Sequence, residues 1–189
     1  MLETHREKSI ELGEEYLANK EWKKFRADVT FIMANAYRQQ AEALQQISAS
    51  LQTAMSTIDK ERAKQTREQS IQYFERFFDL CDDFLSVMPD HKYAKDFVGM
   101  MGSVYFKRRS FEELLEKFAG FENGTFDPSI GYANKTELQG TQAMGRINYM
   151  SGLAFLASGN YDAAKPFHGA VFGVSIDGLP LDEAAVEED

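Results

Sequence analysis

Apolar residues recur at helical spacing along most of the chain, and this pattern predicts an all-α fold. Residues 3–18 are predicted to form an amphipathic helix, with Ile10 and Leu17 set among glutamates and lysines. No segment shows a convincing alternation of apolar and polar residues with period two, so strands are not expected. The pattern predicts further helices over residues 92–107, 110–120 and 137–157, and a last one after Asn160.

A long helical hairpin is predicted over about residues 21–88. The interval from Glu14 to Met88 contains neither glycine nor proline, and so no strong helix breaker. Its first half carries a heptad seam at Thr30, Met33, Tyr37, Gln40, Leu44, Ile47, Leu51, Ala54 and Ile58. Apolar periodicity resumes at residue 71, which predicts two antiparallel helices, about 21–56 and 60–87. A single unbroken rod is disfavoured, because helices average about a dozen residues.

The seam over residues 30–58 has two interpretations. It packs against residues 71–88 inside one chain, or it pairs with a second copy of the chain. Gln40 and Ser48 lie on or beside the seam and are weak core formers, so a homo-oligomer through the seam stays open as an alternative. We favour the internal hairpin.

Domain organisation follows from the breakers and the charge. Residues 121–136 are rich in Gly, Pro, Asn and Ser and predict a long loop, of a kind that is often functional or mobile. We expect a single domain over residues 1–176 and an acidic tail over 177–189. The tail holds six acidic residues and no Lys or Arg, so it supplies most of the net charge of −9 and is predicted to be disordered.

Composition argues against several classes of protein. The acidic balance opposes loose nucleic-acid binding, which draws its affinity from basic residues. No run of 18 apolar residues and no signal-peptide pattern is present, so neither a membrane span nor secretion is expected. Cys81 is the one cysteine, which rules out an intramolecular disulfide and favours a reducing cytoplasm.

Candidate catalytic and metal residues have ordinary structural explanations. The densest acidic cluster with a histidine nearby is Asp79, Asp82, Asp83, Asp90 and His91, which suits a hard cation only if the ligands converge. A solvated helix face explains it equally well, and Cys81 lies on an apolar stripe. No nucleophile elbow, P-loop or Glu-x-x-His pair is present. We predict no catalytic residue, metal or cofactor, and keep an all-α metal-dependent enzyme as the least favoured alternative.

A glycine–aromatic signature occurs three times in the chain. Each glycine is followed by an aromatic residue at +3, a large apolar residue at +4 and a second aromatic residue at +9. The three sets are Gly13, Tyr16, Leu17 and Trp22; Gly102, Tyr105, Phe106 and Phe111; and Gly152, Phe155, Leu156 and Tyr161. A mid-helix glycine costs about 1 kcal/mol relative to alanine, so its recurrence indicates a close approach between helices.

This signature resembles the tetratricopeptide-repeat family, in which each unit is a pair of antiparallel helices. Ala164 also matches the small residue expected early in the second helix, whereas Phe25 and Leu114 at the equivalent places do not. The units are 89 and 50 residues apart instead of about 34, so the repeats are degenerate. The resemblance implies helical hairpins stacked as a short right-handed superhelix with a concave protein-binding surface.

We therefore predict a non-catalytic, cytoplasmic adaptor, chaperone or assembly factor that binds a peptide or helical segment of another protein. The expected partner-binding residues are Tyr16, Met101, Tyr105, Lys107, Arg108, Arg109, Arg146 and Tyr149. The basic run Lys107–Arg109 favours an acidic partner segment. The residues that follow the three glycines do not support the family's carboxylate clamp. The alternative is a structural subunit of a larger assembly that docks through its long hairpin.

Overall fold

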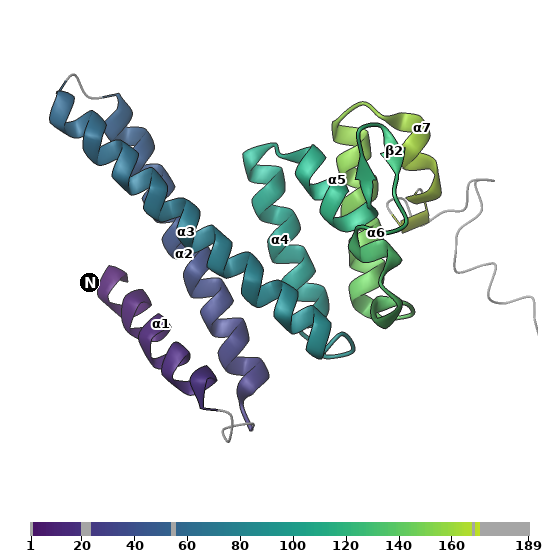
Figure 1. Cartoon of the computed structure of the whole chain (residues 1–189), viewed down its shortest axis with the longest axis horizontal. Coiled ribbons are helices and arrows are strands. Elements are labelled where there is room, and N and C mark those ends of the chain that lie inside the picture. Colours follow the sequence, from purple (N-terminus) through teal and green to yellow (C-terminus); the bar gives the residue numbers. More distant parts are fainter. Residues whose placement is uncertain (1, 20–23, 54–55, 168, 171–189) are drawn as a thin grey trace, which may run out of the picture. The chain divides into compact units, whose positions relative to one another are not determined.

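The structure, a computed structural model, describes residues 2–19, 24–53, 56–167 and 169–170 (Figure 1). It confirms the all-α class: within these ranges the chain forms seven α-helices, three short 3-10 helices and one two-stranded sheet. Trp22, Ala54 and the predicted tail over 177–189 lie outside the described residues.

The chain divides into two compact units, Met1–Phe84 and Leu85–Asp189, which we call the N-terminal and C-terminal units. This differs from the single domain over 1–176 that the sequence predicted. No helix that the structure describes combines the length and the low charge needed to cross a bilayer.

The N-terminal unit contains the predicted long hairpin. Its helices are α1 (Leu2–Ala18), α2 (Arg26–Gln52) and α3 (Thr57–Val87), whose last turn crosses the unit boundary. The break between α2 and α3 excludes the single unbroken rod. Figure 1 shows α1 lying beside the first part of α2, while the far end of the α2–α3 hairpin extends beyond α1.

The predicted seam of α2 is buried only along its first half. Thr30, Met33, Tyr37, Gln40 and Leu44 are buried, whereas 46% of Ile47 and 72% of Ile58 are exposed. The seam prediction fails at this end because α2 ends at Gln52, so Ile58 lies on α3 and does not continue the seam.

Small residues form the ridge between α2 and α3. Ser48 Oγ donates to the Ala63 carbonyl at 2.7 Å, and Ser70 Oγ donates to the Ala41 carbonyl at 2.8 Å. Each pair joins a short side chain to the backbone of the facing helix, so the two helices approach closely. The seven-residue steps from Ala41 to Ser48 and from Ala63 to Ser70 place these contacts in one antiparallel register, and all four residues are buried. The antiparallel hairpin of α2 and α3 is thus confirmed, while a homo-oligomer through the seam stays an untested alternative.

Gly13 allows α1 to approach α2 closely. A Cβ built on Gly13 lies 2.3 Å from Met33 Cγ and 2.4 Å from Met33 Sδ. In the C-terminal unit, a Cβ on Gly102 lies 2.2 Å from Met150 Cε. Two of the three signature glycines thus have the role that the sequence predicted, each against a methionine of a neighbouring helix.

We expect Gly13→Ala to destabilise the protein although alanine is the better helix former. The buried Met33 must shift, at a cost of about 1–3 kcal/mol that exceeds the gain in helix propensity. Gly145→Ala is the matched control, because a Cβ there meets nothing within 4 Å, and we expect it to stabilise by about 0.5–1 kcal/mol. Urea unfolding measures both changes. Equal gains in the two variants would show that α1 does not need a glycine at this crossing.

The C-terminal unit is built around α6. Its helices are α4 (Ala94–Arg108), α5 (Phe111–Ala119), α6 (Gln142–Ala157) and α7 (Tyr161–Ala164). Helix α6 packs against α4, α5 and α7. Phe97, Phe118, Ile147 and Phe155 are fully buried in this core.

The two helical hairpins of this unit have the same turn. Ser110 N donates to the Tyr105 carbonyl at 3.0 Å, and Asn160 N donates to the Phe155 carbonyl at 2.9 Å. The preceding residues, Arg109 and Gly159, both have a left-handed backbone, with φ of 56° and 76°. Signature residues 50 positions apart therefore occupy equivalent places, which supports an internal repeat within this unit.

This turn also explains why Ser110 and Asn160 do not cap the helices that follow them. Ser110 and Asn160 make no side-chain capping bond, and their ψ angles are 61° and 68°. Thr141 does cap α6: its ψ is 160°, and its hydroxyl accepts a hydrogen bond from Met144 N at 3.2 Å. An extended backbone at the N-cap points the side chain toward the first turn of the helix. The hairpin turn gives Ser110 and Asn160 a different backbone conformation, so their side chains do not reach that turn. After α7, Pro166 lies in a 3-10 helix, Lys165–Phe167.

The segment over 121–136 is more ordered than a long loop. It begins with the strands β1 (Phe121–Glu122) and β2 (Thr125–Phe126), followed by the 3-10 helices η1 (Tyr132–Asn134) and η2 (Thr136–Leu138). Asp127 N donates to the Gly120 carbonyl at 2.7 Å. The buried Tyr132 ring lies 5.6 Å from the Phe118 ring. These contacts tie the segment to the end of α5.

Candidate functional site

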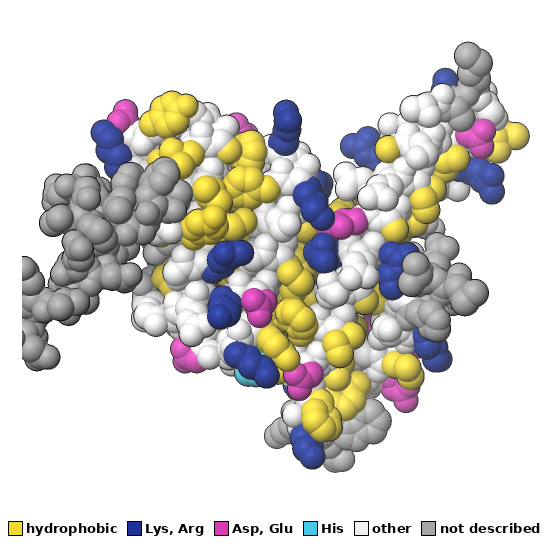
Figure 2. Space-filling model, turned by 180° about the vertical axis from the view of Figure 1, so that it is seen from behind, with side chains coloured by type: hydrophobic (Ala, Val, Ile, Leu, Met, Phe, Trp, Pro, Cys, Tyr) yellow, Lys and Arg dark blue, Asp and Glu magenta, His cyan; other side chains and the backbone are white. Residues whose placement is uncertain are grey.

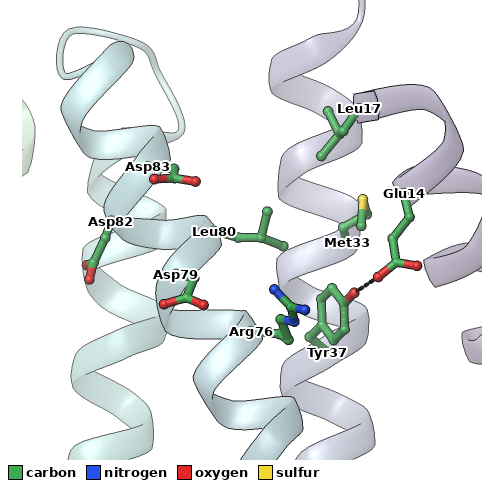
Figure 3. Close-up of a pocket in the computed structure, with 9 residues that line it drawn as sticks. All are labelled: Glu14, Leu17, Met33, Tyr37, Arg76, Asp79, Leu80, Asp82 and Asp83. Atoms are coloured by element: carbon green, nitrogen blue, oxygen red, sulfur yellow. Dashed lines mark hydrogen bonds between the residues drawn. The ribbon is translucent and has the colours of Figure 1, made fainter. Parts of the chain in front are cut away.

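A groove on the N-terminal unit is the candidate site. Two adjoining cavities of ≈ 460 and ≈ 500 Å³ share Glu14, Tyr37 and Arg76 in their linings. Figure 3 shows Met33 and Tyr37 of α2 between the side chains of α1 and those of α3. The groove therefore runs between α1 and α3, with α2 as its floor.

Each helix contributes a stripe of residues at alternating three- and four-residue steps. Helix α1 contributes Glu7, Ile10, Glu14 and Leu17; α2 contributes Met33, Tyr37, Gln40 and Leu44; α3 contributes Gln69, Gln72, Arg76, Asp79 and Asp83. This spacing is that of the seam positions in a helical bundle. The three helices thus present seam positions toward a common groove. The lining residues of α1 and α3 extend over a rise of about 15–20 Å, or three to four helical turns.

The groove has an apolar floor and acidic walls. Met33 and Leu44 are buried in the floor, and the half-buried Leu17 and Leu80 face each other across one end. The charged lining residues are Glu7, Glu14, Asp79, Asp82, Asp83 and Arg76, which carry a net charge of −4. The electrostatic potential in this groove therefore favours cations.

Tyr37 links the floor to one wall. Its hydroxyl donates a hydrogen bond to Glu14 Oε1, drawn as the dashed line in Figure 3. Burial raises the pKa of Tyr37 well above its ordinary value, and the hydrogen bond to Glu14 raises it further. The bond fixes the carboxylate of Glu14 at the edge of the groove.

We expect Tyr37→Phe to lower the free energy of unfolding by about 1–2 kcal/mol, because a hydrogen bond to a charged acceptor is lost. The raised pKa of Tyr37 also gives a pH dependence. Above about pH 10 the unfolded chain releases this proton while the folded chain keeps it, so stability falls as pH rises. The fall should be shallower in Tyr37→Phe. Urea unfolding of both proteins at a series of alkaline pH values measures the difference, and parallel curves would contradict this assignment.

Gln40 brings an unsatisfied polar atom to the groove. The side chain lines the groove beside Leu44, is only 3% exposed, and its Oε1 has no hydrogen-bond partner among the described residues. A buried acceptor without a donor costs about 1–3 kcal/mol.

The predicted partner-binding residues do not lie in this groove. Tyr16 is in the N-terminal unit, where its hydroxyl accepts a hydrogen bond from Phe25 N at 3.1 Å. Met101 and Tyr105 belong to the core of the C-terminal unit, with exposures of 0% and 7%. This face of α4 packs against other elements, so Met101 and Tyr105 are not available on the surface for a partner. Met101 Sδ accepts from the Tyr132 hydroxyl at 3.8 Å, and the Tyr105 ring lies edge-on to Phe118.

The other five predicted residues lie in the C-terminal unit. Lys107, Arg108 and Arg109 are exposed at the end of α4. Arg146 stacks over the Tyr149 ring at 5.3 Å, and a Cβ on Gly99 would contact its guanidinium at 3.4 Å. On the face shown in Figure 2, lysine and arginine side chains are scattered and form no single patch. The structure therefore brings Arg146 and Tyr149 together, but nothing in it selects an acidic ligand for them.

The predicted metal alternative finds no support in the geometry. Among the described residues, no three His, Cys, Asp or Glu side chains converge on a position that could hold a metal ion. Asp79, Asp82 and Asp83 instead belong to the lining of the groove. Cys81 is buried in the core, as the apolar stripe predicted.

The groove was not predicted from the sequence, because apolar periodicity does not reveal a polar wall. The α3 wall is a polar stripe at Gln69, Gln72, Arg76, Asp79 and Asp83. The three- and four-residue spacing of that stripe was a usable signal.

Comparison with family models found no match, and comparisons with curated proteins and with solved structures found none either. The resemblance to tetratricopeptide repeats therefore stays a prediction.

Proposed function

We propose that the protein is a non-catalytic protein-binding module whose N-terminal unit binds a helical segment of a partner protein. An adaptor, a chaperone and an assembly factor all fit this description. The observation that carries the proposal is the convergence of three seam stripes on one groove. Amphipathic helices are commonly recognised by laying their apolar face into such a groove.

The dimensions of the groove support a helix as the ligand. A helix of about three to four turns matches the lined length of α1 and α3. Its apolar side chains would pack on Met33, Leu17 and Leu80, so that the partner takes the place of a fourth helix in a bundle. A small-molecule ligand is less well supported, because the groove is elongated and open along its length.

Site-specific photocrosslinking in a native extract tests the proposal. A photoreactive amino acid at Gln72, on the groove wall, is expected to crosslink a defined partner protein. The same amino acid at Ile32, an exposed position of α2 outside the groove lining, is the matched control. The crosslink at Gln72 should disappear in a Leu80→Glu variant, because a charge then enters the apolar end of the groove. Equal crosslinking from Ile32 and Gln72, or persistence in Leu80→Glu, would contradict binding in the groove.

A second candidate function is a structural subunit that docks through the long hairpin. Ile47 of α2 and Ile58 of α3 favour it, since both are large apolar residues of this hairpin that are exposed. Ile47→Lys and Ile58→Lys should then weaken assembly and leave crosslinking from Gln72 unchanged, which separates the two functions.

A further inference from the structure

We propose that the ligand of the groove is a basic amphipathic helix, with a heptad apolar stripe flanked by lysines or arginines. This inference rests on the proposed function and specifies the chemistry of the partner. The groove offers the two features that such a helix requires: an apolar floor along α2, and carboxylates on both sides.

The positions of the carboxylates define the pattern of charge on the ligand. Glu7 and Glu14 lie on α1, and Asp79 and Asp83 lie on α3, so acidic side chains flank the groove from two helices. A helix seated on the floor places the residues beside its apolar stripe close to these walls. Charges at such flanking positions select partners in helical bundles. Lysine or arginine there would be attracted on both sides, and glutamate would be repelled.

The charge on α3 is graded along the groove. Gln69 and Gln72 form the wall at one end, Arg76 lies in the middle, and Asp79 and Asp83 form the other end. The cations of the ligand should therefore concentrate over the turns that pack near Leu17 and Leu80. At the opposite end the lining includes Gln40, whose buried Oε1 has no hydrogen-bond partner among the described residues.

Charge argues against the chain's own terminal segment as the occupant. Residues 177–189 contain six acidic residues and no lysine or arginine, so the acidic groove would repel them. A second copy of the chain is a distinct occupant, which the oligomeric state of the protein identifies.

A set of three synthetic peptides tests the charge selectivity. Each is a labelled amphipathic helix of about five turns with the same leucine stripe, and the flanking positions carry lysine, glutamine or glutamate. Fluorescence anisotropy with the full-length protein measures each dissociation constant at low and at moderate salt. We expect the lysine peptide to bind about tenfold more tightly than the glutamine peptide, with the difference shrinking as salt screens the charges.

Paired variants locate the effect. Asp79→Asn with Asp83→Asn should weaken the lysine peptide about three- to tenfold and leave the glutamine peptide unchanged. Glu68→Gln with Glu75→Gln removes the same charge from exposed positions of α3 outside the groove lining and should change neither. Circular dichroism checks that both double variants stay folded.

The outcomes separate this inference from the proposed function. If the lysine and glutamine peptides bind equally and Leu80→Glu abolishes both, the groove binds helices but the basic ligand is wrong. If no peptide binds, or Leu80→Glu changes nothing, both proposals fail. If light scattering shows a dimer of the protein alone that Leu80→Glu converts to a monomer, a second copy occupies the groove and the basic partner is overturned.

Discussion

Gly131→Ala is expected to lower the free energy of unfolding by about 3–5 kcal/mol. Gly131 has φ 83° and ψ 150°, a backbone conformation that is essentially restricted to glycine. A Cβ built there also lies 2.2 Å from Gly120 N and 2.6 Å from Gly120 Cα. These are backbone atoms at the end of α5, so they cannot move without disturbing the helix cap.

Gly124→Ala is the matched control for backbone strain alone. Gly124 has φ 84° in the β1–β2 turn, and a Cβ there meets nothing within 4 Å. We expect it to cost about 1–2 kcal/mol, from the left-handed backbone only. Urea unfolding followed by circular dichroism measures both variants. Similar losses in the two would mean that the 121–136 segment is not packed against the end of α5.

Ala41→Leu is expected to destabilise the N-terminal unit by about 3–5 kcal/mol. Ala41 is fully buried, and its carbonyl accepts the hydrogen bond from Ser70 Oγ. A leucine side chain would force α2 and α3 apart. The displaced Ser70 hydroxyl would then be left buried without its acceptor, so overpacking and a lost hydrogen bond add together.

Ala49→Leu tests whether the loss of stability arises from the buried position of Ala41 on the ridge and not from the size of the leucine side chain. Ala49 is an exposed residue on the same helix, and the change should alter the stability by less than about 0.5 kcal/mol. The same unfolding experiment compares the two. A loss below about 1 kcal/mol in Ala41→Leu would contradict the close packing of the hairpin, since overpacking a buried helix contact normally costs more.

The helices could be predicted from the sequence because each presents apolar residues at helical spacing. Gly13 and Gly102 could also be assigned, since a glycine retained inside a helix needs a close neighbour to explain it. The close neighbours themselves, Met33 and Met150, could not be predicted, because they lie on other helices at 20 and 48 residues' distance. Which helix face meets which neighbour depends on tertiary packing, and spacing along the chain does not determine it.

Met101 and Tyr105 were predicted to bind a partner but are buried, again because spacing along the chain does not determine which helix face is covered. Both lie on a helix that contacts other elements on several sides, so no stripe of α4 could be assigned to solvent from periodicity alone. The candidate groove was missed because its walls are polar. Asp79 and Asp83 suggest a cation site when taken alone, whereas their three- and four-residue spacing with Gln69, Gln72 and Arg76 indicates the groove wall.

Helix binding in the groove is tested most directly by methyl NMR of the full-length protein labelled on methionine and leucine methyl groups. The lysine peptide is titrated in, and the Met33, Leu17 and Leu80 methyl signals are followed. Met150, buried in the C-terminal unit, serves as the internal control. We predict saturable shifts of the three groove residues, with the dissociation constant found by anisotropy and no shift of Met150. Shifts confined to the C-terminal unit, or no shift of Met33 at saturation, would contradict the groove as the binding site.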